Sequence, residues 1–271
     1  MKKFFGFLIV FVIATLLFIT YQFLWGKLFP FSPIFPDFSR HELTNTVIYV
    51  QNGVMFGDYA NIDALIPGVE SFHELKFTKK PKIFIFRDKA SYLQRSLSKA
   101  RFCAFPSGSL VISPWALQEA KEGKISLAIY LRHELSHVLI FQHKGFLGSF
   151  YYPKWLLEGI AVYSTDQMGT SFYPSKKETY RLIKEGNFLP PQDFKTKKED
   201  RVKLKVKFRP TFMYSEFGCI VDYLIKTEGK AKFLAYIKGL LKNDNHDQVF
   251  KEVYGLDFDQ FLERFKAFVE K

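Results

Sequence analysis

The chain contains only two cysteines, and they are far apart in the sequence. Cys103 and Cys219 do not form a C-x-x-C pair, which argues against a thiolate metal site and against a dithiol redox function. They fit either one disulfide in an oxidising compartment or two buried thiols, and their spacing leaves both alternatives open.

Acidic residues are fewer than basic residues. The chain has 39 Lys and Arg against 27 Asp and Glu, a net charge of +12, and only residues 195–207 (KTKKEDRVKLKVK) are locally dense in charge. That run is typical of a solvated loop and strand face. The 32 phenylalanines do not alternate with basic residues as they do on surfaces that stack nucleic-acid bases. The sequence therefore predicts a protein with an ordinary apolar core that does not bind nucleic acid.

The amino end carries a long run without charge. Residues 4–25 (FFGFLIVFVIATLLFITYQFLW) form a helix of about 30 Å at about 1.5 Å per residue, which matches the hydrocarbon core of a bilayer. No small-x-small cleavage site follows, so we expect an uncleaved single-pass anchor. Tyr21 and Trp25 stand where interfacial aromatics lie, and Lys2 and Lys3 place the amino end in the cytoplasm. The rest of the chain is then extracytoplasmic.

The patterning after the anchor changes from strand-like to helical. We expect an anchor (1–26), a proline-rich linker that stays extended (27–40), a β-containing subdomain (41–144) and a helical subdomain (145–271). The predicted strands are residues 46–50, 82–86 and 109–113. The predicted helices are residues 126–143, 153–167, 176–186, 211–228, 231–242, 246–254 and 257–270. This order predicts an α+β fold.

One stretch, RHELSHVLIFQH, has a metal-binding pattern. His133 and His137 are four residues apart and Glu134 lies between them, the H-E-x-x-H arrangement that directs two imidazoles from one helix face toward a zinc ion. With 6 histidines in the chain, this pattern arises by chance in about 0.7% of such sequences. Two earlier HEL triplets lack the second histidine, because Asn45 and Phe77 stand in its place. Only the third copy can chelate.

His143 stands where metzincin peptidases have their third ligand. The metzincin pattern H-E-x-x-H-x-x-G-x-x-H requires a glycine that ends the helix, and Ile140 occupies that position. A β-branched residue favours a continued helix, which places His143 about 240° around and about 9 Å along the axis from His137. We therefore expect His143 to cap the helix before Gly145 and not to bind metal.

A better third ligand lies in YPKWLLEGIAVYS. Glu158 is the lone carboxylate of a strongly apolar helix, and a buried carboxylate must be paired, protonated or bound to a metal. Gly159 beside it permits two helices to approach closely. The alternative is an exposed acid on an ordinary amphipathic helix. We predict that His133, His137 and Glu158 bind Zn²⁺ in a cleft between the two subdomains.

HELSH followed by WLLEGIAVY resembles the gluzincin metallopeptidases, the thermolysin-like group, and more narrowly the membrane-anchored or secreted peptidase MA-like family. The similarity covers about residues 80–270 and includes IFIFRDKASY, a Y-x-x-x-G-x-x-x-x-Y-L pattern from Tyr214 to Leu224, and GLDFDQFLERF. The resemblance implies the same three zinc ligands, Glu134 as general base, and an edge strand at residues 109–113 that lines the cleft. The outer acid four residues after the ligand glutamate in thermolysin-like enzymes is replaced by Val162, and Asp166 is its nearest substitute.

The expected activity is zinc-dependent hydrolysis of peptide bonds in proteins or peptides outside the cytoplasm. Glu134 would take the proton of the attacking water, and Tyr214 is the first candidate to stabilise the oxyanion, although it is equally a core tyrosine. His246 is a weaker candidate. The rivals are a non-catalytic extracytoplasmic zinc-fold domain for binding or envelope assembly, and a helical membrane scaffold whose motif is accidental.

Overall fold

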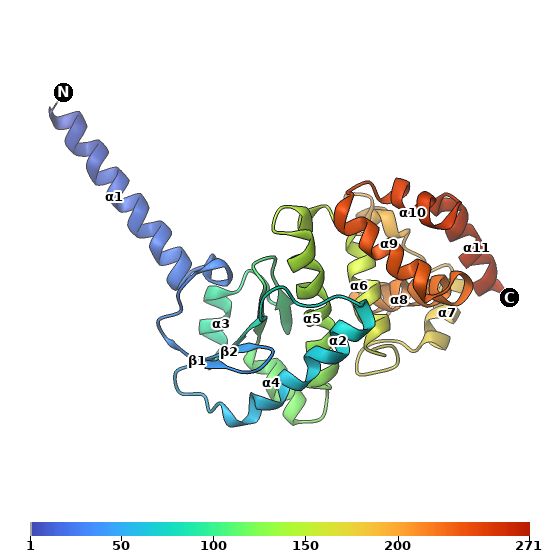
Figure 1. Cartoon of the computed structure of the whole chain (residues 1–271), viewed down its shortest axis with the longest axis horizontal. Helices are drawn as coiled ribbons and strands as arrows, with labels where there is room; N and C mark the ends of the chain where they lie inside the picture. The colour runs from blue at the N-terminus through green and yellow to red at the C-terminus, as the bar shows by residue number, and fades with distance from the viewer. Residues whose placement is uncertain (1) are drawn as a thin grey trace.

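The computed structural model describes residues 2–271, except for the side chains of residues 2, 3 and 58. Over this part the fold is α+β, with eleven α-helices and one five-stranded sheet. A sheet half (blue to green) and a helical half (yellow to red) lie side by side, and the amino-terminal helix projects away from the sheet half (Figure 1). The predicted fold class is confirmed.

The sheet has the order β1-β2-β3-β5-β4. Its strands are β1 (Phe38–Glu42), β2 (Val47–Gln51), β3 (Lys82–Ile85), β4 (Phe102–Ala104) and β5 (Ser109–Ile112). The central strands β2, β3 and β5 are parallel, whereas β1 and β4 run antiparallel to their neighbours. Strands β2, β3 and β5 match the three predicted strands, but the short outer strands β1 and β4 were not predicted.

The expectation that residues 109–113 form the edge strand is wrong. β5 lies between β3 and β4, so the edge on this side of the sheet is β4. The turn before β5 contains Gly108 at φ +80, a conformation that suits glycine, and it folds β4 back along the outer side of β5. A three-residue strand gives too little alternation to be recognised in the sequence.

Helix α5 (Leu127–Lys144), which carries the motif, packs on one face of the sheet. Ser126 begins it by accepting a hydrogen bond from the backbone N–H of Ile129. Its apolar side chains, including Leu135 and Leu139, share a core with Ile83 and Ile85 of β3. The same half contains three short helices that were not predicted: α2 (Ile66–His73), α3 (Lys89–Arg95) and α4 (Pro114–Lys121).

The helical half contains six helices and matches the predicted ones closely. They are α6 (Lys154–Ser164), α7 (Lys176–Lys184), α8 (Arg209–Glu228), α9 (Lys230–Lys242), α10 (His246–Tyr254) and α11 (Phe258–Glu270). Gly159 of α6 lies so close to α8 that an added Cβ would stand 2.8 Å from the carbonyl oxygen of Phe217. Gly218 of α8 faces Val162 of α6 in the same way. The glycine beside Glu158 therefore permits a close approach, but its partner is α8 and not α5.

The segment after the amino-terminal helix, α1 (Lys2–Leu24), folds onto the domain. Phe29, in the short 3₁₀ helix Phe29–Phe31, is fully buried, and Phe35 and Phe38 join it in an aromatic cluster with Phe84 and Phe86 of the sheet. The expectation of a free extended spacer is therefore wrong. Burial of these rings offsets the entropy lost when the segment is ordered.

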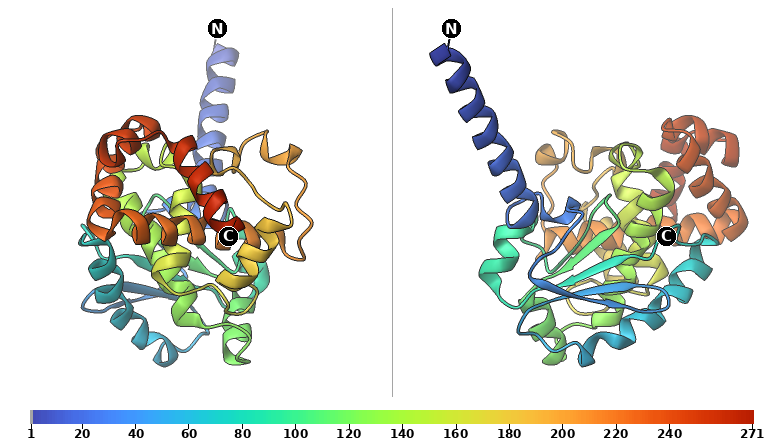
Figure 2. Two further views of the ribbon diagram at one scale, coloured as in Figure 1. Left: turned by 90° about the vertical axis from the view of Figure 1, so that its right-hand side faces the viewer. Right: turned by 60° about the vertical axis from the view of Figure 1, so that its left-hand side comes forward.

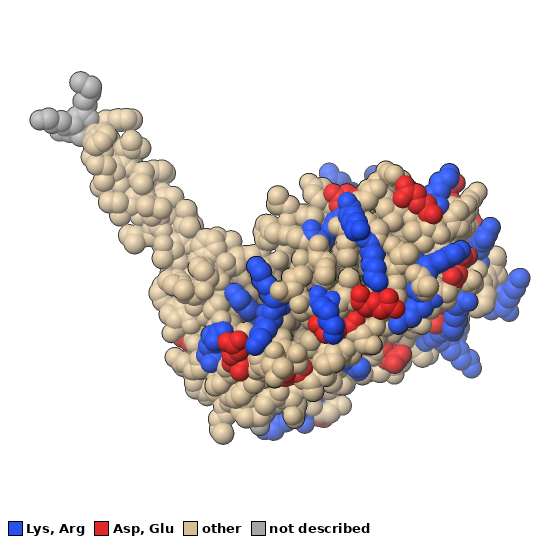
Figure 3. Space-filling model, viewed as in Figure 1, with Lys and Arg blue, Asp and Glu red and all other residues tan. Residues whose placement is uncertain are grey.

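Helix α1 (Lys2–Leu24) contains a span, Phe4–Leu24, that is long and apolar enough to cross a membrane, and none of it is buried. Its described surface is uncharged in Figure 3, in contrast to the mixed charges of the domain. Met1 and the side chains of Lys2 and Lys3, on which the predicted orientation depends, lie outside the described part of the chain. That orientation stays a prediction.

Candidate metal centre

The three predicted ligands meet at one point between α5 and α6. His133 and His137 lie one turn apart on α5, and Glu158 comes from the middle of α6. The Nε2 atoms of the two histidines are 3.3 Å and 3.5 Å from the same oxygen, Oε2, of Glu158. All three side chains are buried, and their ligand atoms lie within 4.8 Å of one another. This group could hold a metal ion.

The hydrogen bond that Nδ1 of His133 makes indicates whether Nε2 of the same ring can bind a cation. Nδ1 of His133 is 2.7 Å from Oε1 of Gln167, and a carbonyl oxygen only accepts, so Nδ1 carries the proton. Nε2, which faces the carboxylate of Glu158, then either carries the second proton of a charged ring and donates it in a hydrogen bond, or presents the lone pair of a neutral ring. Two acceptors at this distance repel each other unless a positive charge lies between them. Two imidazole nitrogens and one carboxylate oxygen are a donor set that suits a divalent ion such as Zn²⁺.

The charges of the site favour an ionised carboxylate. Burial raises the pKa of Glu158, but hydrogen bonds from His133 and His137 outweigh it and hold that pKa well below its usual range. Burial lowers the pKa of His133, but contact with Glu158 and the charge of Glu134 raise it overall. The ammonium of Lys195 lies 3.6 Å from Oε1 of Glu158. The carboxylate therefore already attracts positive charge.

Glu134 lies beside the ligands and is not one of them. Its Oε2 accepts a hydrogen bond of 2.8 Å from the backbone N–H of Ala104, at the end of β4. The carbonyl oxygen of Arg101 accepts from the N–H of Ser113, and the N–H of Phe105 donates to the carbonyl oxygen of Ser109, so both residues face β5. Backbone groups in an antiparallel strand alternate in direction, and those of Phe102 and Ala104 therefore point away from β5. Glu134 is thus held against the free edge of the sheet.

Gln167 was missed by the sequence analysis. Val162, where thermolysin-like enzymes have an acid, packs against Gly218, and Asp166, a candidate substitute that the sequence did not favour, is exposed. Asp166 adopts a left-handed conformation at φ 51, which carries the chain from the end of α6 back toward α5. Gln167, the next residue, is fully buried and reaches His133. The resemblance to thermolysin-like enzymes pointed to an acid after Glu158, whereas an amide oxygen accepts the hydrogen bond from His133 equally well.

Tyr214 lies near the ligands. Its ring, on α8, is stacked 6.4 Å from the ring of His133. Burial, followed by the charge of Glu158, raises the pKa of the Tyr214 hydroxyl, so the phenol keeps its proton and can donate a hydrogen bond.

The other two histidines that were considered lie outside the site. His246 packs among the rings of Trp155, Tyr236 and Phe258. Helix α5 continues to Lys144, and Nε2 of His143 is 2.8 Å from the carbonyl oxygen of Lys76. His143 thus lies near a helix end as expected, but the carbonyl that it contacts belongs to another segment. It is not part of the cluster that could hold a metal.

The ligands open into a cleft of about 660 Å³ between the two halves of the domain. β4, α5, α6 and α8 contribute to its walls, together with Tyr173 and Lys195 from connecting segments. Tyr214 and Glu134 both line it, so these two side chains face the same space as His133, His137 and Glu158. Cys103 also lines the cleft, and both cysteines are free thiols, which excludes the disulfide alternative for this structure.

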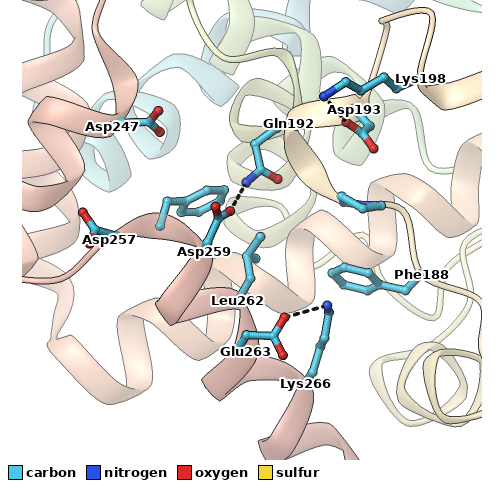
Figure 4. A pocket seen from close by; sticks show the side chains of 12 residues that line it. Phe188, Gln192, Asp193, Lys198, Asp247, Asp257, Asp259, Leu262, Glu263 and Lys266 are labelled. Atoms are coloured by element: carbon cyan, nitrogen blue, oxygen red, sulfur yellow. Dashed lines mark hydrogen bonds and ion pairs between the residues drawn. The ribbon is translucent and has the colours of Figure 1, made fainter.

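A second cavity of about 660 Å³ lies beside α11, away from the ligands. Figure 4 shows that its polar side chains largely satisfy one another: Gln192 donates to Asp259 at 2.7 Å and Lys266 to Glu263 at 2.9 Å. None of the three ligand residues lines it. This cavity therefore lacks the residues that could hold a metal ion in the first cleft.

Comparisons with known proteins add nothing to this geometry. No protein-family model matches the chain, and no curated protein sequence matches it. A functional assignment rests on the chain's own residues.

Proposed function

We propose that this chain is a zinc-dependent, membrane-tethered metallopeptidase of the gluzincin type that hydrolyses peptide bonds outside the cytoplasm. The observation that carries the proposal is the convergence of His133, His137 and Glu158 in a buried cluster, with Glu134 beside it in an open cleft. A binding-only domain has no need of that fourth residue.

The imidazoles of His133 and His137, through Nε2, and the carboxylate of Glu158 would hold the ion. Zn²⁺ bound there supplies a Lewis acid that polarises a substrate carbonyl and lowers the pKa of a water molecule. Gln167 keeps the ring of His133 in the tautomer whose lone pair faces the ligand position.

Glu134 acts as the general base of the proposed reaction. It takes the proton from the attacking water and passes it to the leaving amine. The N–H of Ala104 holds Oε2 of Glu134, and this fixes the carboxylate beside the free edge of β4. Tyr214 donates its phenolic proton to the oxyanion that develops, an interaction worth about 3 kcal/mol in comparable enzymes.

The free edge of β4 supports a polypeptide substrate. The N–H of Phe102 and the C=O groups of Phe102 and Ala104 point outward from the short sheet edge that lines the cleft, and the N–H of Ala104 is already bonded to Glu134. An extended peptide binds such an edge as an added strand, with its side chains alternating between the cleft wall and solvent. The scissile bond would then lie next to Glu134.

The experiment compares metal content and hydrolysis in the full chain purified in detergent. The wild type should contain about one zinc per chain and cleave an unfolded protein substrate, whereas Glu134→Gln should keep the zinc and lose cleavage. Glu158→Ala should lose the zinc. His143→Ala is the matched control and should change neither property.

Three results would reject parts of this proposal. Cleavage by Glu134→Gln would remove the proposed base. Loss of zinc in His143→Ala, with retention in Glu158→Ala, would support the metzincin ligand scheme instead. Stoichiometric zinc in a wild-type protein that cleaves no peptide bond would support the non-catalytic binding domain.

A further inference from the structure

Helix α1 leaves the domain from a fixed position. Gln94, at the end of α3, donates a hydrogen bond of 2.9 Å to the hydroxyl of Tyr21. The ammonium of Lys27 donates to the carbonyl oxygens of Leu93 and Ser96. If α1 crosses a bilayer, these contacts determine which side of the domain faces the lipid.

The loop between α5 and α6 lies on that side. Residues 145–151 (GFLGSFY) contain no charge, and the loop stands at the end of α5 on the side from which α1 departs (Figures 1 and 2). The ring of Phe146 is 5.8 Å from that of Phe31, in the segment that follows α1. The loop is therefore continuous with the exit point of the anchor.

In this loop the large apolar side chains are exposed and a polar side chain is buried. Phe146, Leu147, Phe150 and Tyr151 are 48%, 72%, 58% and 68% exposed, whereas Ser149 is 1% exposed. Four large apolar side chains that face water in one short loop are unfavourable for a soluble surface and typical of a contact with an apolar partner.

This inverted arrangement is held in place by specific contacts. The ammonium of Lys154 donates to the carbonyl oxygen of Ser149 at 2.9 Å, and the hydroxyl of Ser149 donates to the carbonyl oxygen of Gly145 at 2.6 Å. The rings of Phe146 and Phe150 pack edge to face at 5.7 Å. The apolar surface is thus built into the fold.

A basic segment lies on the same side. In both views of Figure 2 the connection that contains residues 195–207 reaches the upper part of the domain, the end from which α1 departs, and Figure 1 shows that it lies over the helical half. Within them Lys203, Lys205 and Lys207 are exposed, while the intervening Val202, Leu204 and Val206 turn toward the core. Three lysines on one face of an extended segment suit a surface of negative charge.

We propose that the apolar loop 146–151 and the three lysines 203, 205 and 207 form a second membrane contact, which docks the domain on the surface of an anionic bilayer. Phe146, Leu147, Phe150 and Tyr151 enter the interface between headgroups and acyl chains, and the lysines pair with lipid phosphates. The partner is a lipid surface, because the loop contacts the segment that follows α1 through Phe31 and Phe146, and the exposed lysines carry the charge that anionic headgroups attract.

Docking would also restrict the substrate, an extension that rests on the proposed peptidase function. The cleft is lined by Lys154, three residues after the loop, by Lys195 at the start of the basic segment, and by Phe208 immediately after its end. Residues of the cleft wall are therefore close in sequence to both docking elements. The substrates expected are polypeptides held at the bilayer surface, such as the juxtamembrane segments of other membrane proteins.

The experiment uses the full chain in nanodiscs of phosphatidylcholine and phosphatidylglycerol that contain a phospholipid with a photoreactive diazirine near its headgroup. Cross-linked peptides are identified by mass spectrometry. Peptides that contain residues 145–152 should be labelled in addition to α1. Leu147→Asp combined with Tyr151→Asp should reduce this labelling about tenfold or more, because charge replaces buried apolar area. Lys203→Gln, Lys205→Gln and Lys207→Gln together should reduce it several-fold.

Met55 provides the matched control. It is 82% exposed, and the connection between β2 and the next helix, which contains it, lies at the bottom of the domain in Figure 2, whereas α1 departs at the top. Met55→Asp should leave labelling of the loop unchanged, and its own peptide should stay unlabelled. Labelling confined to α1, or equal labelling of the Met55 peptide and the loop, would overturn the proposal. These readouts do not depend on peptidase activity, so docking and catalysis can fail separately.

Discussion

The amide oxygen of Gln167 lies 2.7 Å from Nδ1 of His133 and sets the tautomer of one ligand ring. Gln167→Ala should weaken zinc binding about 10- to 100-fold, because partners of this kind orient ligands and raise their basicity. Competition with a chromophoric chelator measures the change. Gln167→Glu keeps an acceptor and should retain wild-type affinity or exceed it.

The neighbouring exposed residue is the control for this experiment. Asp166→Ala should leave zinc affinity unchanged. An equal loss in both variants would mean that the turn after α6, and not the hydrogen bond to His133, determines the affinity.

Lys195 competes with a metal ion for the charge of Glu158. Its ammonium lies 3.6 Å from Oε1, but the side chain is 52% exposed, so solvent screens most of the interaction. Lys195→Met should therefore tighten zinc binding by only about two- to fivefold. Lys198→Met, a few residues further along the same segment, should have no effect. Weaker zinc binding in Lys195→Met would show that the lysine supports the site.

Gly159 is required by the contact between α6 and α8. A Cβ at this position would stand 2.8 Å from a backbone oxygen, so Gly159→Ala should destabilise the protein by about 1–3 kcal/mol. Gly68 of α2 has open space at its Cβ position, and Gly68→Ala should be neutral or stabilise by up to about 1 kcal/mol. Thermal unfolding in detergent compares the two variants. Equal stability of both would contradict the tight packing at Gly159.

Glu216 should make the protein less stable as the pH rises. Its buried carboxyl group contacts only the backbone N–H of Leu189 among its described hydrogen bonds, and burial raises its pKa well above 4.5. The folded protein therefore binds one more proton than the unfolded chain above pH 4.5. Stability from this group is fully present below that pH and falls by up to about 1.4 kcal/mol per pH unit until the folded-state pKa is passed.

Replacement of Glu216 by glutamine removes this dependence. Glu216→Gln keeps an oxygen that can accept from Leu189, and it should flatten the pH profile of the unfolding free energy and raise stability at neutral pH. The exposed Glu263→Gln is the control. A wild-type profile that rises with pH where Glu216→Gln is flat would contradict the assigned pKa direction.

The sequence predicted most of the helical half and three of the strands, because these segments have strong periodicity. It also identified His133, His137 and Glu158, since their residue types and spacing are local signals. It did not identify Gln167, whose role depends on the turn at Asp166, or the edge strand β4, which is too short to show alternation. Contacts between segments that are distant in the sequence cannot be predicted from the local residue pattern.

The burial of Phe29, Phe35 and Phe38 against the sheet has a practical consequence for preparing a water-soluble fragment. A truncation at residue 40, where the proline pattern suggests a boundary, would delete all three rings and uncover Phe84 and Phe86. The packed core begins within a few residues of the end of α1, so a fragment intended for crystallisation has to start before Phe29.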